Sequence, residues 1–318
     1  TFRLIHNQPL LKTIRQLWCL LWRRHFFFVY YPPMKLITQC ASRKTISNTS
    51  KTEMVNFNYI NNVEERVQLW LESLNNQPKT TTTWDLYTGH YYKILNSILP
   101  TNIEKSIIST GYGVLYENDV VTDYMVTYAS HIDKPTKINQ LKGVNYRDWH
   151  NILCKKRNTL PLVDWVNKDD IVIILLGQDY LKVIQEDLLD VYNKLSDKNN
   201  FIVVSTSKTS ILPNTLPING SWRKWLGGPQ NVMGPNILGK ILEDNLPLNF
   251  KKLNKHFLEV YKPLAEKSNV KYKDEFFINY IKSNPLKSQG QLIKELRGKN
   301  ISISTGRMAR LYIYNKNI

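Results

Sequence analysis

Cysteine is scarce in this chain of 318 residues, and its scarcity excludes two kinds of fold stabilisation. The three cysteines, Cys19, Cys40 and Cys154, are odd in number and far apart, so neither a disulfide framework nor a CxxC metal pair is present. This usage is typical of a reducing compartment, and we therefore expect a cytoplasmic protein.

Several catalytic motifs are also absent. The sequence contains no Walker loop, no GxGxxG, no HExxH and no HxE…CxxC pattern. Its six histidines are scattered along the chain, which gives a metal site little support. We therefore expect neither a metal nor a cofactor.

Long apolar runs are missing as well. Residues 1–33 begin with Thr and contain LWCLLWRRHFFFVYYPP, whose apolar runs are split by Arg23, Arg24 and His25 and fall far short of the roughly 20 residues of a membrane helix. A signal peptide would carry its positive charges before the apolar region. We expect the native protein to start at Met34, with residues 1–33 an upstream translation or a poorly folded leader. A membrane-surface segment is the alternative.

Acidic residues are few, with 26 Asp and Glu against 43 Lys and Arg, and the imbalance is uneven. Residues 246–318 hold fifteen basic and five acidic residues, and residues 1–33 hold five basic and no acidic ones, which leaves the centre at a net charge of +2. A basic module of this kind suits a polyanion, because each phosphate contact releases counterions. The alternative is a solvated lysine-rich surface.

What the chain does contain is a set of short β-branched runs between amphipathic segments. The runs lack polar alternation, which is typical of strands buried on both faces of a parallel sheet. The predicted strands are Lys35–Thr38, Ser106–Ser109, Ile171–Leu176 and Phe201–Val204. The predicted helices are Val63–Leu74, Trp84–Ile98 and Tyr180–Leu195. Residues 34–245 are therefore predicted to form a Rossmann-like α/β domain, a mostly parallel sheet with helices on both faces.

Small, hydroxyl and basic residues follow each predicted strand, in CASRKT, STGYG, GQDY and STSK. Parallel sheets bind ligands beyond the carboxyl ends of their strands, where such residues suit an anionic or nucleotide-like ligand. The candidate ligand-binding residues here are Ser42, Arg43, Lys44, Ser109, Gly111, Gly113, Gly177 and Tyr180. The alternative is that these residues only form turns and helix caps.

The last part, residues 246–318, is predicted to be a basic helical module. Its helices are expected at Asp274–Ser283, Gln289–Arg297 and Thr305–Tyr314, in an arrangement like a helix-turn-helix or winged helix. Arg297, Lys299, Arg307 and Arg310 are the candidate nucleic-acid-binding residues. A helical cap on the α/β core is the alternative.

One segment resembles a known family. Leu86-Tyr-Thr-Gly89 with His90-Tyr-Tyr92, followed by STGYGVLYENDVVTDYMVTY, is similar to the YaaA-like proteins and to a related bacterial and phage family with an SAGYGL…D…PY…TF signature. The similarity extends from residue 35 to about residue 240 and departs from the signature at Thr110 and Asp123. It implies a mixed α/β fold, DNA binding and protection from DNA damage. It also implies a cleft lined by tyrosine, glycine and carboxylate residues, which adds Tyr87 and Gly89 to the candidate ligand-binding residues.

Three residues of this segment are candidates for chemistry. Asp119 is the candidate acid or base, and Tyr112 and Tyr124 are positioned to donate hydrogen bonds or stack on a base. A folded turn with core tyrosines and a capping Asp119 is the alternative.

These observations favour a nucleic-acid-associated protein with a nucleotide- or base-binding cleft, with DNA favoured over RNA as the partner and roles in DNA damage protection or base modification. One alternative is an enzyme of nucleobase or nucleoside glycosyl transfer or base modification. Another is a non-catalytic α/β scaffold that binds a small molecule or a partner. Whether the protein is an enzyme stays open at this point.

Overall fold

The computed structural model describes residues 33–45, 52–128, 139–205, 212–267, 272–299, 301 and 303–316. The predicted leader, residues 1–33, lies outside the described residues except for Pro33. The part up to Lys267 and the part from Tyr272 are considered separately below.

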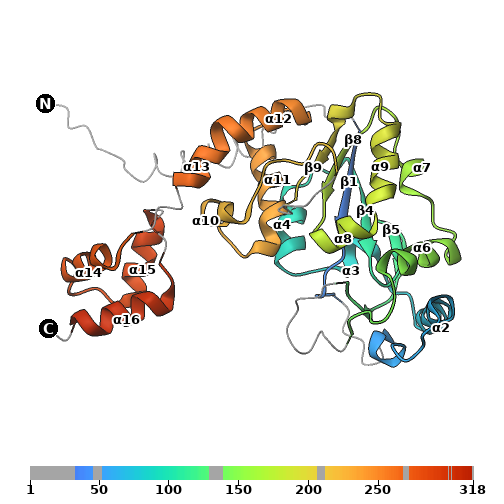
Figure 1. Ribbon diagram of the computed structural model, residues 1–318, viewed down its shortest axis with the longest axis horizontal. Coiled ribbons are helices and arrows are strands. Elements are labelled where there is room, and N and C mark those ends of the chain that lie inside the picture. Colours follow the sequence, from blue (N-terminus) through green and yellow to red (C-terminus); the bar gives the residue numbers. More distant parts are fainter. Residues whose placement is uncertain are drawn as a thin grey trace, which may run out of the picture. The chain divides into compact units, whose positions relative to one another are not determined.

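The first part is built on a five-stranded sheet (Figure 1). Its strands are β1 (Met34–Gln39), β4 (Ile103–Ser109), β5 (Gly113–Tyr116), β8 (Ile171–Leu175) and β9 (Phe201–Val203). Their order across the sheet is β5-β4-β1-β8-β9, and every pairing is parallel except the antiparallel pair β4–β5. All four predicted strands are confirmed, and β5 adds a strand that the apolar runs did not predict.

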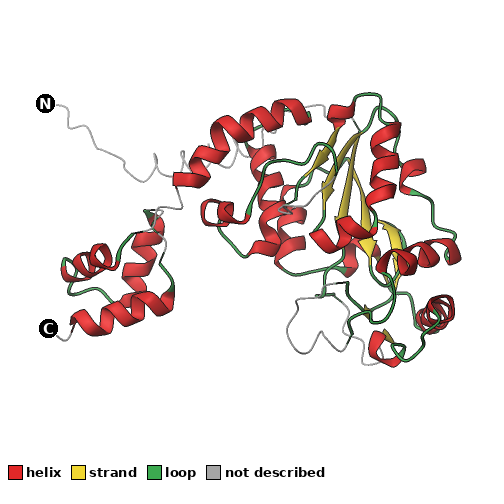
Figure 2. Ribbon diagram, in the orientation of Figure 1, coloured by secondary structure: helices red, strands yellow, loops and turns green. Residues whose placement is uncertain are grey.

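Helices cover both faces of this sheet, as the doubly apolar strands predict (Figures 1 and 2). One face carries α4 (His90–Ile98) and α11 (Met233–Glu243), and the other carries α6 (Tyr146–Lys156) and α9 (Gln185–Lys194). The strands β8 and β9 are buried along their whole length. The architecture is therefore a mixed α/β fold with a mostly parallel sheet.

Two of the predicted helices are interrupted. The segment 84–98 forms α3 (Thr83–Leu86) and α4, separated at Gly89, whose φ of 95° requires a residue without a side chain. The segment 180–195 forms α8 (Gln178–Val183) and α9, separated at Ile184. The prediction of one continuous helix in each segment is therefore wrong, whereas α2 (Val63–Asn75) confirms the third helix.

Short elements complete this part. They are β2 (Thr52–Glu53) paired with β7 (Tyr124–Met125), β3 (Thr81–Thr82) paired with β6 (Val120–Val121), α7 (Leu162–Trp165), α10 (Arg223–Leu226) and the 3₁₀ turns η1 (Met54–Asn56), η2 (Lys198–Asn200), η3 (Gly220–Trp222) and η4 (Gln230–Val232).

A long helical segment follows Leu246. It runs from α12 (Phe250–His256) through a π-helical turn, η5 (Phe257–Tyr261), into α13 (Lys262–Lys267). Phe257 stacks on Trp222 with ring centroids 5.5 Å apart, and Tyr261 contacts Trp225 at 5.0 Å. These helices therefore pack on the aromatic residues that precede α11.

The second part has its own apolar core. It consists of α14 (Asp274–Lys282), α15 (Gln289–Gly298) and α16 (Thr305–Lys316), which confirm the three predicted helices. The cluster is buried and contains Phe277, Ile281, Leu292, Ile293, Leu296, Ile303, Met308 and Leu311. A helical unit of three helices around one core is therefore present, and we call it the three-helix module.

Among the helices of the described ranges, none is both long enough and apolar enough to cross a membrane.

Candidate functional site

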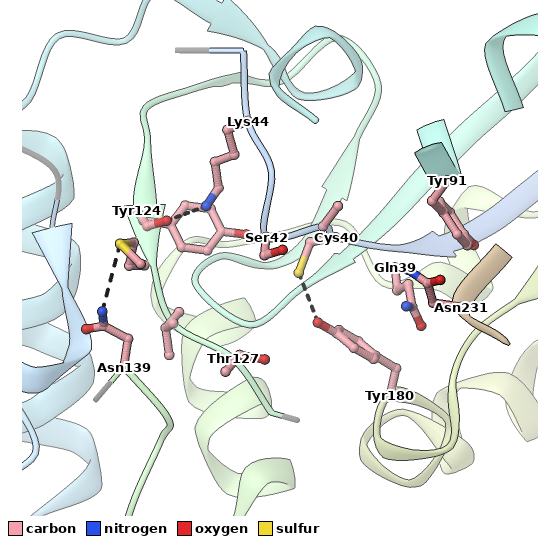
Figure 3. Close-up of a pocket in the computed structure, with 13 residues that line it drawn as sticks. Gln39, Cys40, Ser42, Lys44, Tyr91, Tyr124, Thr127, Asn139, Tyr180 and Asn231 are labelled. Carbon is pink, nitrogen blue, oxygen red and sulfur yellow. Dashed lines mark hydrogen bonds between the residues drawn. The ribbon is translucent and has the colours of Figure 1, made fainter. Parts of the chain in front are cut away.

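A cavity of about 250 Å³ opens at the carboxyl end of β1. After β1 the chain forms β4 on one side of β1, and it later forms β8 on the other side. The strand β1 therefore lies where the strand order reverses. Connections diverge at such a point and leave a crevice beyond the strand ends, which is where parallel sheets bind ligands. The described residues that line the cavity are Gln39, Cys40, Ala41, Ser42, Lys44, Tyr91, Tyr124, Met125, Val126, Thr127, Asn139, Tyr180 and Asn231 (Figure 3).

Residues from three strand ends meet at the Cys40 thiol. The Tyr180 hydroxyl, from α8 beyond β8, lies 3.1 Å from Cys40 Sγ. Thr110, from the turn after β4, places its Oγ1 3.4 Å from the Tyr180 hydroxyl and 4.0 Å from the sulfur. Figure 3 shows the Tyr180 hydroxyl directed at the thiol. The sulfur is thus held at the wall of the cavity.

A chain of hydroxyl groups supports Tyr124. Ser109 Oγ accepts the backbone N–H groups of Gly111 and Tyr112 at 3.2 Å, so both of its lone pairs are used and its own hydrogen is left for Tyr124, 2.6 Å away. The Tyr124 and Tyr87 hydroxyl oxygens lie 2.7 Å apart and share a further hydrogen bond. Burial holds the pKa values of Tyr87 and Tyr124 well above their ordinary value. Both rings therefore stay neutral and fixed.

Lys44 is held by an ion pair beside the Tyr124 ring. Its Nζ lies 3.3 Å from Asp123 Oδ1, donates to the Tyr124 carbonyl oxygen and sits 4.2 Å from the centroid of the Tyr124 ring. Only 7% of each of the Lys44 and Asp123 side chains is exposed. The cation is thus paired within the fold, close to the cavity.

The other two candidates for chemistry lie away from the described lining. Asp119 Oδ2 accepts the Tyr116 N–H at 3.0 Å and so holds the turn between β5 and β6. The Tyr112 hydroxyl accepts the Thr122 N–H at 3.1 Å, and burial raises the pKa of Tyr112 to about 12. Both contacts are those expected of the folded-turn alternative.

The three predicted glycines that follow strand ends have two different roles. Gly111 faces the Tyr124 ring so closely that a Cβ there would lie 2.6 Å from Cδ2 of the ring. Gly113, the first residue of β5, has a φ of 79°, and a Cβ there would lie 2.6 Å from Cys154 Sγ. Gly177 donates its N–H to Gln39 Oε1 at 2.6 Å, which joins the ends of β1 and β8. Two of these glycines therefore allow close packing, and one links two strand ends.

Some of the remaining predicted residues line the cavity and others do not. Ser42 and Lys44 line the cavity, whereas Arg43 is exposed and packs against Gly89. The predicted fourth strand end, STSK, continues into residues 206–211, which lie outside the described residues. The structure thus gathers the first three strand ends.

Several lining residues were not predicted from the sequence. Gln39 lies immediately after the first predicted strand, and Tyr91 lies within the HYY motif, so both had a signal nearby. Asn139 and Asn231 lie outside every predicted strand, strand end and helix and had no such signal. Asn139 Oδ1 accepts the Val55 N–H at 3.1 Å, and its side-chain amide faces the Met125 sulfur at 3.8 Å.

In the three-helix module, the predicted basic residues differ in their contacts. Arg307 donates to Asp274 Oδ1 at 2.6 Å and to the Tyr272 carbonyl oxygen at 3.0 Å, so it has a structural role. Arg310 is 63% exposed and lies 3.8 Å from Asp274. Lys299 lies 5.2 Å from the centroid of the Tyr280 ring. The side chain of Arg297 lies outside the described residues.

Within the described ranges, no group of three or more His, Cys, Asp or Glu side chains is placed to hold a metal ion. No protein-family model matches the chain, and neither the curated proteins nor the solved structures that were searched include a match to it.

Proposed function

We propose that this is a nucleic-acid-associated protein whose α/β part holds a nucleobase or nucleotide in the cavity beyond β1. The three-helix module would contact a phosphate backbone, with DNA favoured over RNA. The observation that carries the proposal is the lining of the cavity at the carboxyl end of β1, which combines tyrosine rings with side-chain amides. Bases stack on aromatic rings and present hydrogen-bonding edges to Asn and Gln.

The size of the cavity supports a small ligand. Its volume of about 250 Å³ lies below the roughly 300–1,000 Å³ that is usual for sites of drug-sized ligands. A dinucleotide cofactor is too large for this space, whereas a single base or nucleoside suits it. Tyr91 and Tyr180 supply aromatic surface next to the deeply buried Tyr124, and Gln39, Asn139 and Asn231 supply the amides.

Charge supports the second half of the proposal. The three-helix module belongs to the segment with fifteen basic and five acidic residues, and its Arg310 is directed to solvent with most of its side chain exposed. Basic residues on a compact helical unit are what a phosphate backbone attracts. We further infer a Rossmann-like α/β fold and a helix-turn-helix or winged-helix type for the module, in accord with the YaaA-like resemblance and with a role in DNA damage protection or base modification.

Binding is favoured over glycosyl transfer. Glycosyl transfer uses a carboxylate at the reacting sugar, and the described lining contains no carboxylate side chain. Asp119, the predicted acid or base, holds a turn instead. Enzymatic base modification stays a second candidate, because the Cys40 thiol and the Tyr180 hydroxyl, 3.1 Å apart, both line the cavity.

Fluorescence anisotropy tests the proposal. The full chain is titrated into a labelled 20-nucleotide DNA, single-stranded and duplex, at 50 mM and 200 mM NaCl. We expect binding that weakens steeply with salt, because each neutralised phosphate contributes a slope of about −0.9 in log K against log salt for duplex DNA. Undetectable or salt-independent binding at 50 mM NaCl would contradict the nucleic-acid part of the proposal.

A further inference from the structure

We propose that the cavity beyond β1 selects an uncharged nucleobase or nucleoside over its 5′-monophosphate, and that Asp123 sets this selectivity by neutralising Lys44. The inference deepens the proposed function and rests on it, because it names the form of ligand that the same cavity takes. It concerns charge alone and leaves the identity of the base open.

Lys44 is the one charged side chain among the described residues that line the cavity. Its positive charge is already balanced, since Asp123 Oδ1 lies 3.3 Å from Nζ and both side chains are 7% exposed. The Tyr124 carbonyl oxygen accepts a further hydrogen bond from Nζ. A phosphate is bound more strongly by positively charged donors that have no other partner, and this ion pair does not offer such a donor.

Asp123 also acts directly against an anion. It is buried and is adjacent in sequence to Tyr124, which lines the cavity. A phosphate drawn to Lys44 would come close to the Asp123 carboxylate in an environment with little water to screen the repulsion. To bind there, the phosphate would have to separate a buried ion pair, which leaves the carboxylate without its partner.

The rest of the described lining is electrically neutral. The polar groups are the amides of Gln39, Asn139 and Asn231, the hydroxyls of Ser42 and Thr127, the Cys40 thiol and three tyrosine hydroxyls. Burial keeps the pKa values of Tyr91, Tyr124 and Tyr180 above their ordinary value, so these phenols are uncharged at neutral pH. Neutral donors and acceptors with aromatic surfaces suit the edge and the faces of an uncharged base.

Isothermal titration calorimetry on the full chain tests this inference. The probes are adenosine, guanosine, cytidine and uridine and their 5′-monophosphates, at 0.3 M NaCl to suppress binding of nucleotides to the basic surface. We expect at least one nucleoside to bind, and to bind at least tenfold more tightly than its monophosphate. Asp123→Asn should reduce or reverse that ratio, because it leaves Lys44 with an unbalanced charge beside the ligand.

Two further variants keep the test decisive. Asp190→Asn removes an exposed carboxylate on α9 and should leave the ratio unchanged. The double variant Lys44→Met with Asp123→Asn removes both charges and should keep the wild-type preference, so it reports on selectivity even where Asp123→Asn alone fails to fold.

The two ways to fail are distinguishable. A monophosphate that binds as tightly as its nucleoside, or more tightly, would overturn the charge selectivity and leave the proposed base-binding function standing. If none of the eight compounds binds at millimolar concentration, the base-binding function fails and this inference fails with it.

Discussion

Tyr124 shows how closely one residue can be constrained in this molecule. Its ring packs against Gly111, its hydroxyl links Ser109 to Tyr87, and its carbonyl oxygen accepts from Lys44. The Trp70 and Tyr112 rings contact it edge-on at 6.3 and 5.3 Å. These packing contacts and hydrogen bonds set the orientation of the ring at the cavity before any ligand arrives.

The contact with Gly111 gives the first prediction. Gly111→Ala places a methyl group 2.6 Å from the Tyr124 ring, so the ring or the backbone must move. We expect the free energy of unfolding to fall by about 1–3 kcal/mol, the usual cost of overpacking a core. Urea denaturation followed by circular dichroism measures the change.

A matched control is available in Gly220, around which a Cβ would meet no heavy atom within 4 Å. Gly220→Ala should change the free energy of unfolding by less than about 0.5 kcal/mol. Equal effects of the two substitutions would show that the Tyr124 ring is not the cause. Gly111→Ala should also weaken nucleoside binding, because the displaced Tyr124 ring belongs to the lining of the cavity.

At the scale of elements, the sequence predicts features that depend on neighbouring residues better than features that depend on residues far apart in the chain. The strands 34–39, 103–109, 171–175 and 201–203 were predictable because the signal is local: each contains a β-branched run without polar alternation, which is typical of a strand covered on both faces. The convergence of the first three strand ends followed from parallel pairing. Helix interruptions were less accessible, since an isolated Gly89 is compatible with either a helix or a break.

The ion pair of Lys44 and Asp123 lay beyond prediction for a different reason. Its two residues are 79 positions apart, and the contact depends on where the segment after β5 returns to the end of β1. Asn139 lies outside every predicted strand and helix, so no hydrophobic periodicity indicated that it lines the cavity. Asp119 shows the same limit. A carboxylate that follows a glycine turn gives the same sequence pattern whether it is catalytic or holds a turn, and here it holds a turn.

The packing of α6 gives the second prediction. His150 on this helix is 2% exposed, its Nδ1 has no hydrogen-bond partner, and its Nε2 lies 3.6 Å from Cys154 Sγ. Burial first, and Arg147 second, lower the pKa of His150 to about 4 from 6.5. Because the unfolded chain binds the proton more readily, stability should fall as the pH drops from about 6.5 to about 4.

Urea denaturation at pH 7 and pH 5 measures this effect. His150 should account for about 2 kcal/mol of the stability lost between these values. His150→Gln should therefore show a smaller loss than the wild type, whereas His90→Gln, at an exposed position, should show the wild-type loss. A wild-type loss in His150→Gln would mean that the histidine is not neutral in the folded state.

At the scale of the whole molecule, the two proposed kinds of binding belong to different parts of the chain. The α/β centre is nearly neutral and carries a cavity whose one charged lining residue, among those described, is paired. The three-helix module carries exposed basic residues around a separate apolar core. We propose that the cavity binds a neutral group and that the three-helix module contacts a phosphate backbone, so the two kinds of binding should be separable by mutation.

Arg307 and Arg310, three positions apart on α16, allow that separation to be tested. Arg310→Ala removes an exposed charge, so the slope of log K against log salt for duplex DNA should become shallower by roughly 0.9 while the nucleoside affinity stays unchanged. Arg307→Ala instead removes the contacts with Asp274 and the Tyr272 carbonyl oxygen, so its main effect should be a lower melting temperature of the module. Anisotropy at four salt concentrations, calorimetry with the nucleoside and thermal unfolding distinguish the two variants. An unaltered salt slope in Arg310→Ala would remove this residue from the DNA contact, and a simultaneous loss of nucleoside affinity would show that the two kinds of binding are coupled.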